Sequence, residues 1–554
     1  MNFKYKKTLC TALCVLLMGS LLGCGSVRSS ANTTAASLIL ASDVTAGSEA
    51  AEADEILITL SDAGSVSDSA AVSIDGSAVT ITAEGTYRLT GTLSDGQIVV
   101  SAPEDAKVKL ILDGADITKS GSAAILALSA DKVIVASAEG SVNKVSSTGE
   151  FDAADSIDAA IFAKCDLNLN GDGILYVSCE TGHGVVTKDD LKMKDGTVSV
   201  SAAKKGVEGK DSITVEGGTL LITAGTKGLY SKNEDNEEDG NIEILGGSVT
   251  VTSNDDSIHA GNCVTVSGGE LTLSSGDDGI HADATLAISG GSVTVLQSYE
   301  GLEAQVIDIS GGVIDVTATD DGLNAAGGND GSNGYGMFGG DPFQTDMNAS
   351  LTISGGTLNV DAGGDGLDSN GALNVSGGLV TVSGPTNNGN GALDYGSSAT
   401  ITGGTVIAAG ASGMAENFGS ASTQGSILLS FSAQEAGSTV TITDESGTVL
   451  ASCTPSKAYN SVLISTEALK VGGTYTITAG SYSETVTLTS NIYGNGMGMG
   501  GFGGGMGGHG GMGGPMGGWG SQSGEQPEGW GGEAGGFGGG PGGHGGMGGG
   551  PGRP

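Results

Sequence analysis

The stretch Val264-Thr-Val-Ser-Gly-Gly-Glu-Leu-Thr-Leu-Ser-Ser275 decides the fold, because close copies of it recur along the chain. Alternating apolar and polar residues flank a Gly-Gly pair, which predicts a strand, a turn and a second strand. The first glycines of these pairs are Gly217, Gly246, Gly268, Gly290, Gly311, Gly355 and Gly377. Several spacings are 22 or 21 residues, and the two longer ones contain inserts at 233–240 and 325–348.

A repeat of this length predicts one coil of a right-handed parallel β-helix. Each unit is too short to bury its own apolar face, so successive units must stack with strands about 4.8 Å apart. A propeller blade would need about twice this period. Because no helical periodicity follows the first segment of the chain, we expect an all-β protein.

The rest of the chain divides by composition. Lysines, an apolar run and Leu22-Gly23-Cys24 resemble a lipoprotein signal over 1–23, with a lipid on Cys24 and the protein on the extracellular face of the membrane. A plain signal peptide is the alternative. The segments that follow predict a flexible tether over 24–54, the β-helix over 55–424, a small β-sandwich over 425–492 and a disordered Gly/Met-rich tail over 493–554.

The formal net charge of −41 argues against nucleic acid as a partner, since duplex binding needs a basic surface. None of the three arginines lies within the repeats. An excess of carboxylates outside the cell favours solubility, calcium binding or both.

In a β-helix, residues one coil apart stand above each other, so aligning the repeats on Ser275-Gly-Asp-Asp-Gly-Ile-His-Ala-Asp283 predicts columns on the surface. The column through Asp278 contains Lys205, Lys227, Asp256, Asp278, Glu300, Asp321 and Asp365. The column before it contains Lys204, Thr226, Asp255, Asp277, Tyr299, Asp320 and Gly364. The column through His281 contains Glu208, Tyr230, His259, His281, Glu303, Asn324 and Asp368.

Stacked carboxylates at this spacing would repel by roughly 3–4 kcal/mol per neighbour at an effective dielectric near 20. A bound cation relieves the repulsion, and hard oxygen ligands suit Ca²⁺. We therefore expect calcium on Asp255, Asp256, Asp277, Asp278, Glu300, Glu303, Asp320, Asp321 and Asp365. The alternative is a solvated acidic edge whose aspartates serve the turns.

Lysines and aromatic residues supply candidate carbohydrate contacts. Lys205, Lys210, Lys227 and Lys232 precede the acidic coils and form a strip that could meet polymer carboxylates, or simply a solvated face. Exposed aromatic faces suit stacking on sugar rings. This selects Tyr299 in the ladder and Tyr335 and Phe338 in the Gly-rich insert, unless the latter pack the insert against the helix.

Motifs at separated points between about 55 and 420 carry a family resemblance. They include Gly85-Thr-Tyr-Arg-Leu-Thr-Gly, Lys107-Val-Lys-Leu-Ile-Leu-Asp-Gly, Gly209-Lys-Asp-Ser-Ile and Gly384-Pro-Thr-Asn-Asn-Gly. Together they resemble the clostridial carbohydrate-binding parallel β-helix proteins. The resemblance implies a pectate-lyase-like fold, binding of cellulose or polygalacturonate, and calcium held by carboxylates of the β-helix.

We therefore expect a surface lipoprotein that binds polysaccharide through a calcium-stabilised β-helix and does not cleave it. A calcium-dependent polyuronate lyase with a lysine base, such as Lys205 or Lys227, is one alternative, and a structural or adhesive surface protein is another. Acid pairs repeated in four coils are more typical of a surface than of one glycosidase site. Gly182-His183-Gly184 resembles a polygalacturonase motif, but it precedes the acid pairs and lacks a following Arg-x-Lys.

Overall fold

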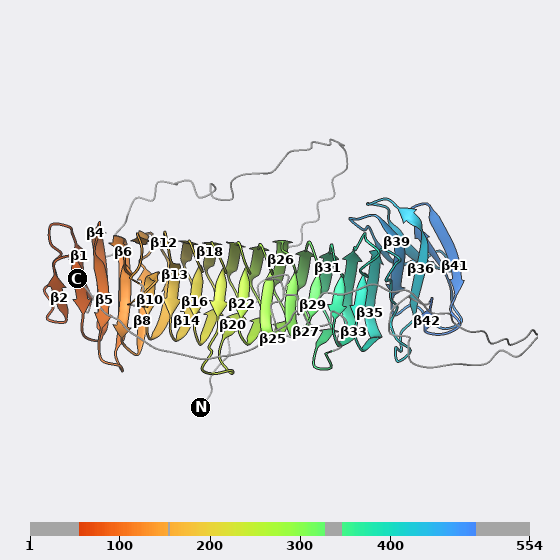
Figure 1. Cartoon of the computed structure of the whole chain (residues 1–554), viewed down its shortest axis with the longest axis horizontal. Helices are drawn as coiled ribbons and strands as arrows, with labels where there is room; N and C mark the ends of the chain where they lie inside the picture. Colours follow the sequence, from red (N-terminus) through yellow and green to blue (C-terminus); the bar gives the residue numbers. More distant parts are fainter. Residues whose placement is uncertain (1–54, 153, 155, 327–345, 495–554) are drawn as a thin grey trace, which may run out of the picture. The chain divides into compact units, whose positions relative to one another are not determined.

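The computed structural model describes residues 55–152, 154, 156–326 and 346–494 (Figure 1). The regular elements within these ranges are all β-strands, which confirms the expected all-β class. Over the same residues no helix has the length and apolarity of a membrane span. Cys24, Tyr335, Phe338, the tether and the Gly/Met-rich tail from residue 495 onward lie outside the described residues.

Successive coils pair in parallel, and a typical coil supplies three strands. One coil contains β20 (Asn241–Ile244), β21 (Ser248–Ser253) and β22 (Ile258–Ala260). The next contains β23 (Cys263–Val266), β24 (Glu270–Ser274) and the start of β25 (Ile280–Ile288). Val249 pairs with Leu271 and His259 with His281, so the shift between these coils is the expected 22 residues. The repeat therefore forms a parallel β-helix, as predicted.

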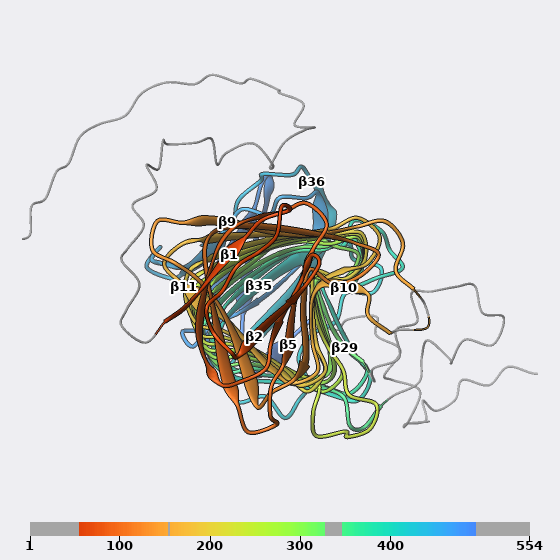
Figure 2. The same ribbon diagram turned by 90° about the vertical axis from the view of Figure 1, so that its left-hand side faces the viewer.

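The strands form three walls around a common interior, which Figure 2 shows in a view along the axis of the β-helix. The short-strand wall consists of β10 (Ala159–Ala163), β13 (His183–Thr187), β16 (Val207–Gly209), β19 (Leu229–Ser231), β22, β25, β27 (Leu302–Ile309), β29 (Leu323–Ala325), β32 (Leu367–Ser369) and β34 (Leu393–Tyr395). A second wall contains β12 (Ile174–Cys179), β15 (Thr197–Ala202), β18 (Thr219–Ala224), β21, β24, β26 (Ser292–Gln297), β28 (Val313–Thr317), β31 (Thr357–Asp361), β33 (Ala372–Ser383) and β35 (Ser398–Gly410). The third contains β11 (Asp166–Gly171), β14 (Asp190–Met193), β17 (Ser212–Val215), β20, β23, the later parts of β25 and β27, and β30 (Ser350–Ile353).

The first coils are less regular than the later ones. They comprise β1 (Ile56–Leu60), β2 (Val72–Asp75), β3 (Ala78–Ile81), β4 (Gly85–Leu93), β5 (Gln97–Ser101), β6 (Lys107–Ser120), β7 (Ile125–Ser129), β8 (Lys132–Ser137) and β9 (Val142–Thr148). β2 and β3 form an antiparallel hairpin, whereas β1 already pairs in parallel with β4.

The core is a set of apolar ladders that run along the coils. On the short-strand wall, Ile258, Ile280, Leu302, Leu323 and Leu367 are all fully buried. The residue after each of them points to the other face of the strand, because side chains alternate along a strand. Burial of the apolar ladder therefore fixes which residues form the outer column.

The Gly-Gly corners allow the coils to approach closely. The second glycine of each pair has a positive φ, for example +77° at Gly291. A Cβ at Gly291 would lie 2.8 Å from backbone atoms of Gly268 and Gly269 in the preceding coil. Both the left-handed conformation and the close backbone contact require glycine here.

A two-layered sandwich follows the last coil. Its first layer joins β36 (Ser426–Gln434), β39 (Tyr459–Ser465) and β42 (Ile492–Tyr493) to β35, because β39 pairs antiparallel with β35. Its second layer is the antiparallel sheet of β37 (Val440–Asp444), β38 (Val449–Cys453), β40 (Thr474–Ala479) and β41 (Tyr482–Thr487). Ile407 of β35 shares a core with Ile442, Ile464 and Ile477, so the sandwich and the last coil are packed together.

The glycine corners give a first prediction. We expect Gly291→Ala to lower the free energy of unfolding by more than the roughly 1–3 kcal/mol of a strained φ, because the new Cβ also meets backbone. Gly114→Ala is the control, since Gly114 has φ +71° but a Cβ added there would have no atom within 4 Å. Urea unfolding followed by circular dichroism measures both, and equal losses would contradict the close-contact argument.

Candidate functional site

The acidic ladder, defined as Asp256, Asp278, Glu300, Asp321 and Asp365, lies in the turns that precede the short-strand wall. The register of that wall is the one expected from sequence. His259 pairs with His281, His281 with Glu303, Glu303 with Asn324, and Asn324 with Asp368. The strand register therefore places the columns as predicted, while the directions of their side chains differ from coil to coil.

The predicted lysine strip is already paired with carboxylates. Lys227 forms ion pairs with Asp255, at 3.0 Å, and with Asp256, whose side chain is fully buried. The other pairs are Lys205 with Glu208 at 3.0 Å, Lys210 with Asp235 at 2.6 Å and Lys232 with Asp283 at 3.0 Å. The strip is thus a set of ammonium groups that neutralise nearby carboxylates rather than an isolated basic surface.

Aromatic rings stack along the column next to the ladder. The Lys205 ammonium lies 3.5 Å from the centroid of the Tyr230 ring, and the Tyr230 and His259 centroids are 5.3 Å apart. His259 and His281 follow at 4.5 Å with nearly parallel rings. A cation over an aromatic face and stacked rings both stabilise this arrangement.

Each histidine of the column contacts a buried carboxylate through Nδ1. His259 Nδ1 lies 2.7 Å from Asp256, and His281 Nδ1 lies 3.1 Å from Asp278 and 2.6 Å from Glu303. Nε2 of His281 lies 3.2 Å from Asp283. The buried carboxylates of these two coils therefore all have a cationic or hydrogen-bonding partner.

The partners and the burial set the protonation of these groups. Burial raises the pKa of Asp256, but the hydrogen bond from His259 and the charge of Lys227 outweigh it and hold the pKa below its usual range. Burial, together with the neighbouring charge of Glu303, raises the pKa of Asp278 to about 9. For His281, burial lowers the pKa, yet hydrogen bonds to Asp278, Asp283 and Glu303 raise it to about 12.

The later half of the ladder, Glu300, Asp321 and Asp365, has neutral hydrogen-bonding partners. None of the ion pairs found in the described ranges includes Glu300, Asp321 or Asp365. Instead, Glu300 accepts a hydrogen bond from the Asn324 amide at 2.9 Å, and Asp321 accepts one from the backbone N–H of Asp365 at 2.6 Å. Burial, followed by the charge of a neighbouring carboxylate, raises the pKa of Glu300 and of Asp321 to about 8, and burial raises that of Asp365 to about 7.

The predicted calcium ligands divide into groups. Carboxylate oxygens of Asp255, Asp256 and Asp277 lie within 4.8 Å of one another. In a second group, carboxylate oxygens of Asp278 and Glu303 and a ring nitrogen of His281 also lie within 4.8 Å of one another. Glu300, Asp320, Asp321 and Asp365 form no group of three at this distance in the described ranges. Carboxylates suit Ca²⁺ in all these places, but at Asp255 and Asp256 an ion would have to compete with Lys227.

A hollow of about 560 Å³ lies beside the ladder. It is lined by Gly225, Thr226, Asn254, Asp255, Gly276, Asp277 and Tyr299. The Tyr299 side chain is 41 % exposed, and its hydroxyl forms a hydrogen bond with Asp320 that, with burial, raises its pKa. This size is within the range of small-molecule sites, and it places one aromatic ring next to carboxylates and an amide.

One predicted column supplies Thr226, Asp255, Asp277 and Tyr299 to the hollow, but sequence reasoning missed the other residues that line it. The other lining residues are Gly225, Asn254 and Gly276, which occupy the column position directly before the acid pairs. Small residues in that column were the available signal. Sequence reasoning also missed the ion pair of Lys232 with Asp283, which lies two coils further along. The Lys232 side chain can pass over the coil between them because Gly261 has no side chain there.

Residues 75–328 match the family described as “Carbohydrate-binding domain-containing protein”. A curated relative with the same description, from Acetivibrio thermocellus, is 35% identical over 128 residues, which make up 22% of this chain and 45% of the relative. The chain thus spans about half the length of the curated relative that it matches.

A solved structure is also similar to this chain. It is described as the polysaccharide lyase-like protein from C. thermocellum, gadolinium derivative. It is 30% identical, covers 42% of this chain and 96% of its own, and superposes with a TM-score of 0.41. The resemblance to clostridial carbohydrate-binding proteins that the motifs carried is confirmed by the family match.

The buried ion pair of Lys227 gives a second prediction. We expect Lys227→Met to lower the free energy of unfolding by about 3 kcal/mol, the lower end for breaking a buried pair, because His259 still bonds Asp256. Lys210→Met is the matched control, since its partner Asp235 is exposed. In urea unfolding the control should match the parent protein, and a similar loss in both variants would be inconsistent with this account.

The raised pKa values of Glu300, Asp321 and Asp365 give a third prediction, on the pH dependence of stability. Because their pKa values are raised on folding, the folded state holds these protons more tightly than the unfolded state. Their contribution to stability is complete below about pH 4 and is lost as the pH rises through 7 to 8. In chelator, the melting temperature should therefore fall between pH 5 and pH 8, and Asp321→Asn should make the fall shallower. Identical slopes in the two proteins would refute this assignment.

Proposed function

We propose that this chain binds polysaccharide at the hollow beside Tyr299 and does not cleave it. The observation that carries the proposal is the half-exposed Tyr299 ring next to the oxygens of Asp255 and Asp277, on a β-helix of a carbohydrate-binding family. An aromatic ring offers its face to the apolar C–H surface of a sugar. Carboxylate and amide oxygens accept hydrogen bonds from sugar hydroxyls. The two features together suit a neutral glycan such as cellulose.

We further propose that Ca²⁺ occupies the later half of the ladder. The ligands would be Glu300, Asp321 and Asp365 of the ladder and the adjacent Asp320, none of which has a lysine or histidine partner among the described ion pairs. When bound, the ion supplies positive charge that relieves the repulsion of stacked carboxylates. It would also let an acidic glycan such as pectate approach a strongly acidic surface.

The contacts of the candidate bases favour binding over lyase activity. A lysine base needs a lowered pKa. Burial lowers the pKa of Lys227, but Asp256 and Asp255 outweigh that effect and raise it overall. His183 of the Gly-His-Gly motif accepts the backbone N–H of Lys205 at Nδ1 and lies 3.3 Å from Asp158 at Nε2. Both of its nitrogens are therefore already used within the protein.

The proposed location is the outer face of the cell membrane, with a lipid on Cys24. This proposal depends on the apolar run and the Leu22-Gly23-Cys24 junction. A tethered β-helix would hold the hollow where extracellular polysaccharide is accessible.

Binding to insoluble glycans tests the function and is the fourth prediction. We expect the full chain to be retained on cellulose and, with calcium present, on pectate, with no ultraviolet absorbance from unsaturated products. Tyr299→Ala should weaken retention about 5-fold, which corresponds to about 1 kcal/mol for an aromatic contact. Tyr176→Ala is the control, because Tyr176 is on β12 and does not line the hollow.

The outcomes separate the three candidate functions. Unsaturated product that depends on calcium would establish a lyase and end the binding-only proposal. Absence of retention on every glycan would favour a structural or adhesive protein. Retention on pectate that survives chelator would count against the calcium proposal alone.

A further inference from the structure

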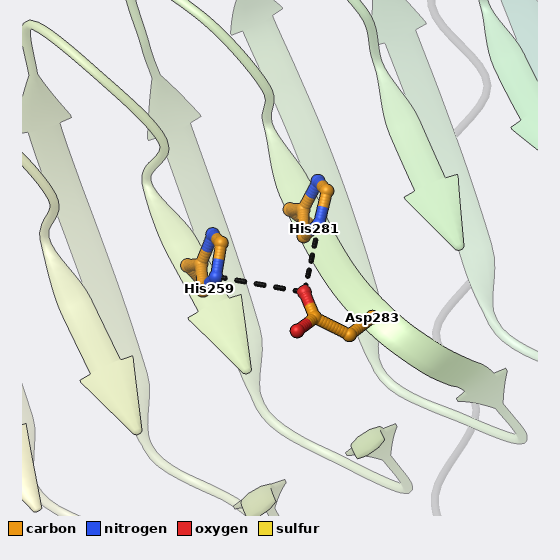
Figure 3. Close-up of side chains that lie close together, drawn as sticks. All are labelled: His259, His281 and Asp283. Carbon is orange, nitrogen blue, oxygen red and sulfur yellow. Dashed lines mark hydrogen bonds and ion pairs between the residues drawn. The ribbon is translucent and has the colours of Figure 1, made fainter. Parts of the chain in front are cut away.

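The histidine pair has a feature that neither glycan binding nor calcium uses. His259 and His281 turn the same ring edge toward Asp283, as Figure 3 shows. Oδ1 of Asp283 lies 3.7 Å from Nε2 of His259 and 3.2 Å from Nε2 of His281. Both histidines are buried, at 5 % and 1 % exposed, so their surroundings allow only small movements of the rings.

The carboxylates on the opposite ring edge decide which nitrogen keeps its proton when each ring is neutral. The Nδ1 atoms lie 2.7 Å from Asp256 in one ring and 2.6 Å from Glu303 in the other. A proton on each Nδ1 satisfies these buried carboxylates, and in the neutral ring Nε2 is then the unprotonated nitrogen. A carboxylate behind a histidine in this way is typical of metal sites, because it fixes the tautomer and orients the ring.

We propose that His259, His281 and Asp283 form a site for a divalent transition-metal ion, with Zn²⁺ the ion that fits. Two imidazole nitrogens and one carboxylate oxygen are a donor set for zinc and its neighbours, whereas calcium and magnesium take oxygen ligands. Three protein ligands leave a fourth position for water. The site uses no residue of the later acidic ladder.

The donor distances suit a tetrahedral ion after a small change. Ligand atoms at about 2.0–2.1 Å from Zn²⁺ in a tetrahedral site are about 3.3 Å apart. The two distances to Asp283, 3.2 and 3.7 Å, bracket this value, and all three donor atoms lie within 4.8 Å of one another. The rings stack at 4.5 Å with an angle of 5° between their planes, so binding requires them to tilt toward each other.

The ligands of the proposed site are accessible and oriented. A divalent ion would take the place of the proton that Nε2 of His281 otherwise shares with Asp283. The Asp283 side chain is 26 % exposed, which gives an ion a path from solvent. Lys232 holds the second oxygen of Asp283 at 3.0 Å and so orients it.

Zinc titration of the full chain tests the site and is the fifth prediction. After treatment with chelator, the parent protein should bind one more equivalent of Zn²⁺ than Asp283→Asn or His259→Asn, as measured by competition with a chromophoric chelator. The loss should exceed about 100-fold in affinity, the upper end for a group that only orients a ligand. His183→Asn is the matched control, because His183 is a buried histidine next to Asp158 without a second ring. His509 and His544 are present in every variant, so their contribution cancels.

A crystallographic measurement on the parent protein keeps the test independent of variant folding. Crystals soaked in zinc should show an anomalous peak between the two Nε2 atoms and Asp283, and excess calcium should not remove it. A missing peak at this position, or an equal zinc count in the parent protein and in folded Asp283→Asn, would overturn the proposal.

Discussion

The spacing of paired strands governs this protein, because in a parallel β-helix each paired strand residue has a counterpart about 4.8 Å away in the next coil. Where the counterparts are apolar, as in the ladder of Ile258, Ile280 and Leu302, this spacing allows close packing. Where they are charged, the same spacing forces like charges together. The core and the acidic surface are therefore two results of one constraint.

The surface meets this constraint differently along its length. In the first acidic coils, Lys227 and the two stacked histidines bring positive charge or hydrogen bonds to Asp256 and Asp278. Further on, Glu300 and Asp321 have an amide and a backbone N–H as partners instead. The raised pKa values of Glu300 and Asp321 show that these neutral partners do not outweigh the effect of burial. The proposed calcium and zinc sites thus differ in position because the protein's own cations are unevenly distributed.

The sequence predicted the β-helix, the coil length and the residue columns, because alternation and spacing are local properties of the chain. His259 stacks on His281 as the alignment expected. The directions of the side chains could not be predicted from the sequence. The ion pair of Lys232 with Asp283 spans two coils, and the hollow at Tyr299 depends on the space that small neighbouring residues do not fill. The antiparallel pairing of β39 with β35, which joins the sandwich to the last coil, also lies outside any periodic pattern.

That pairing has a consequence for how such a protein is assembled. A stack of coils ends in an open strand edge, which is a template for further strands from other molecules. Here β39 covers the edge of β35, and the sandwich packs behind it. The coils between the two ends need only match neighbours like themselves. Gain or loss of one coil during evolution would therefore change the length of the binding surface while leaving the terminating sandwich as it is.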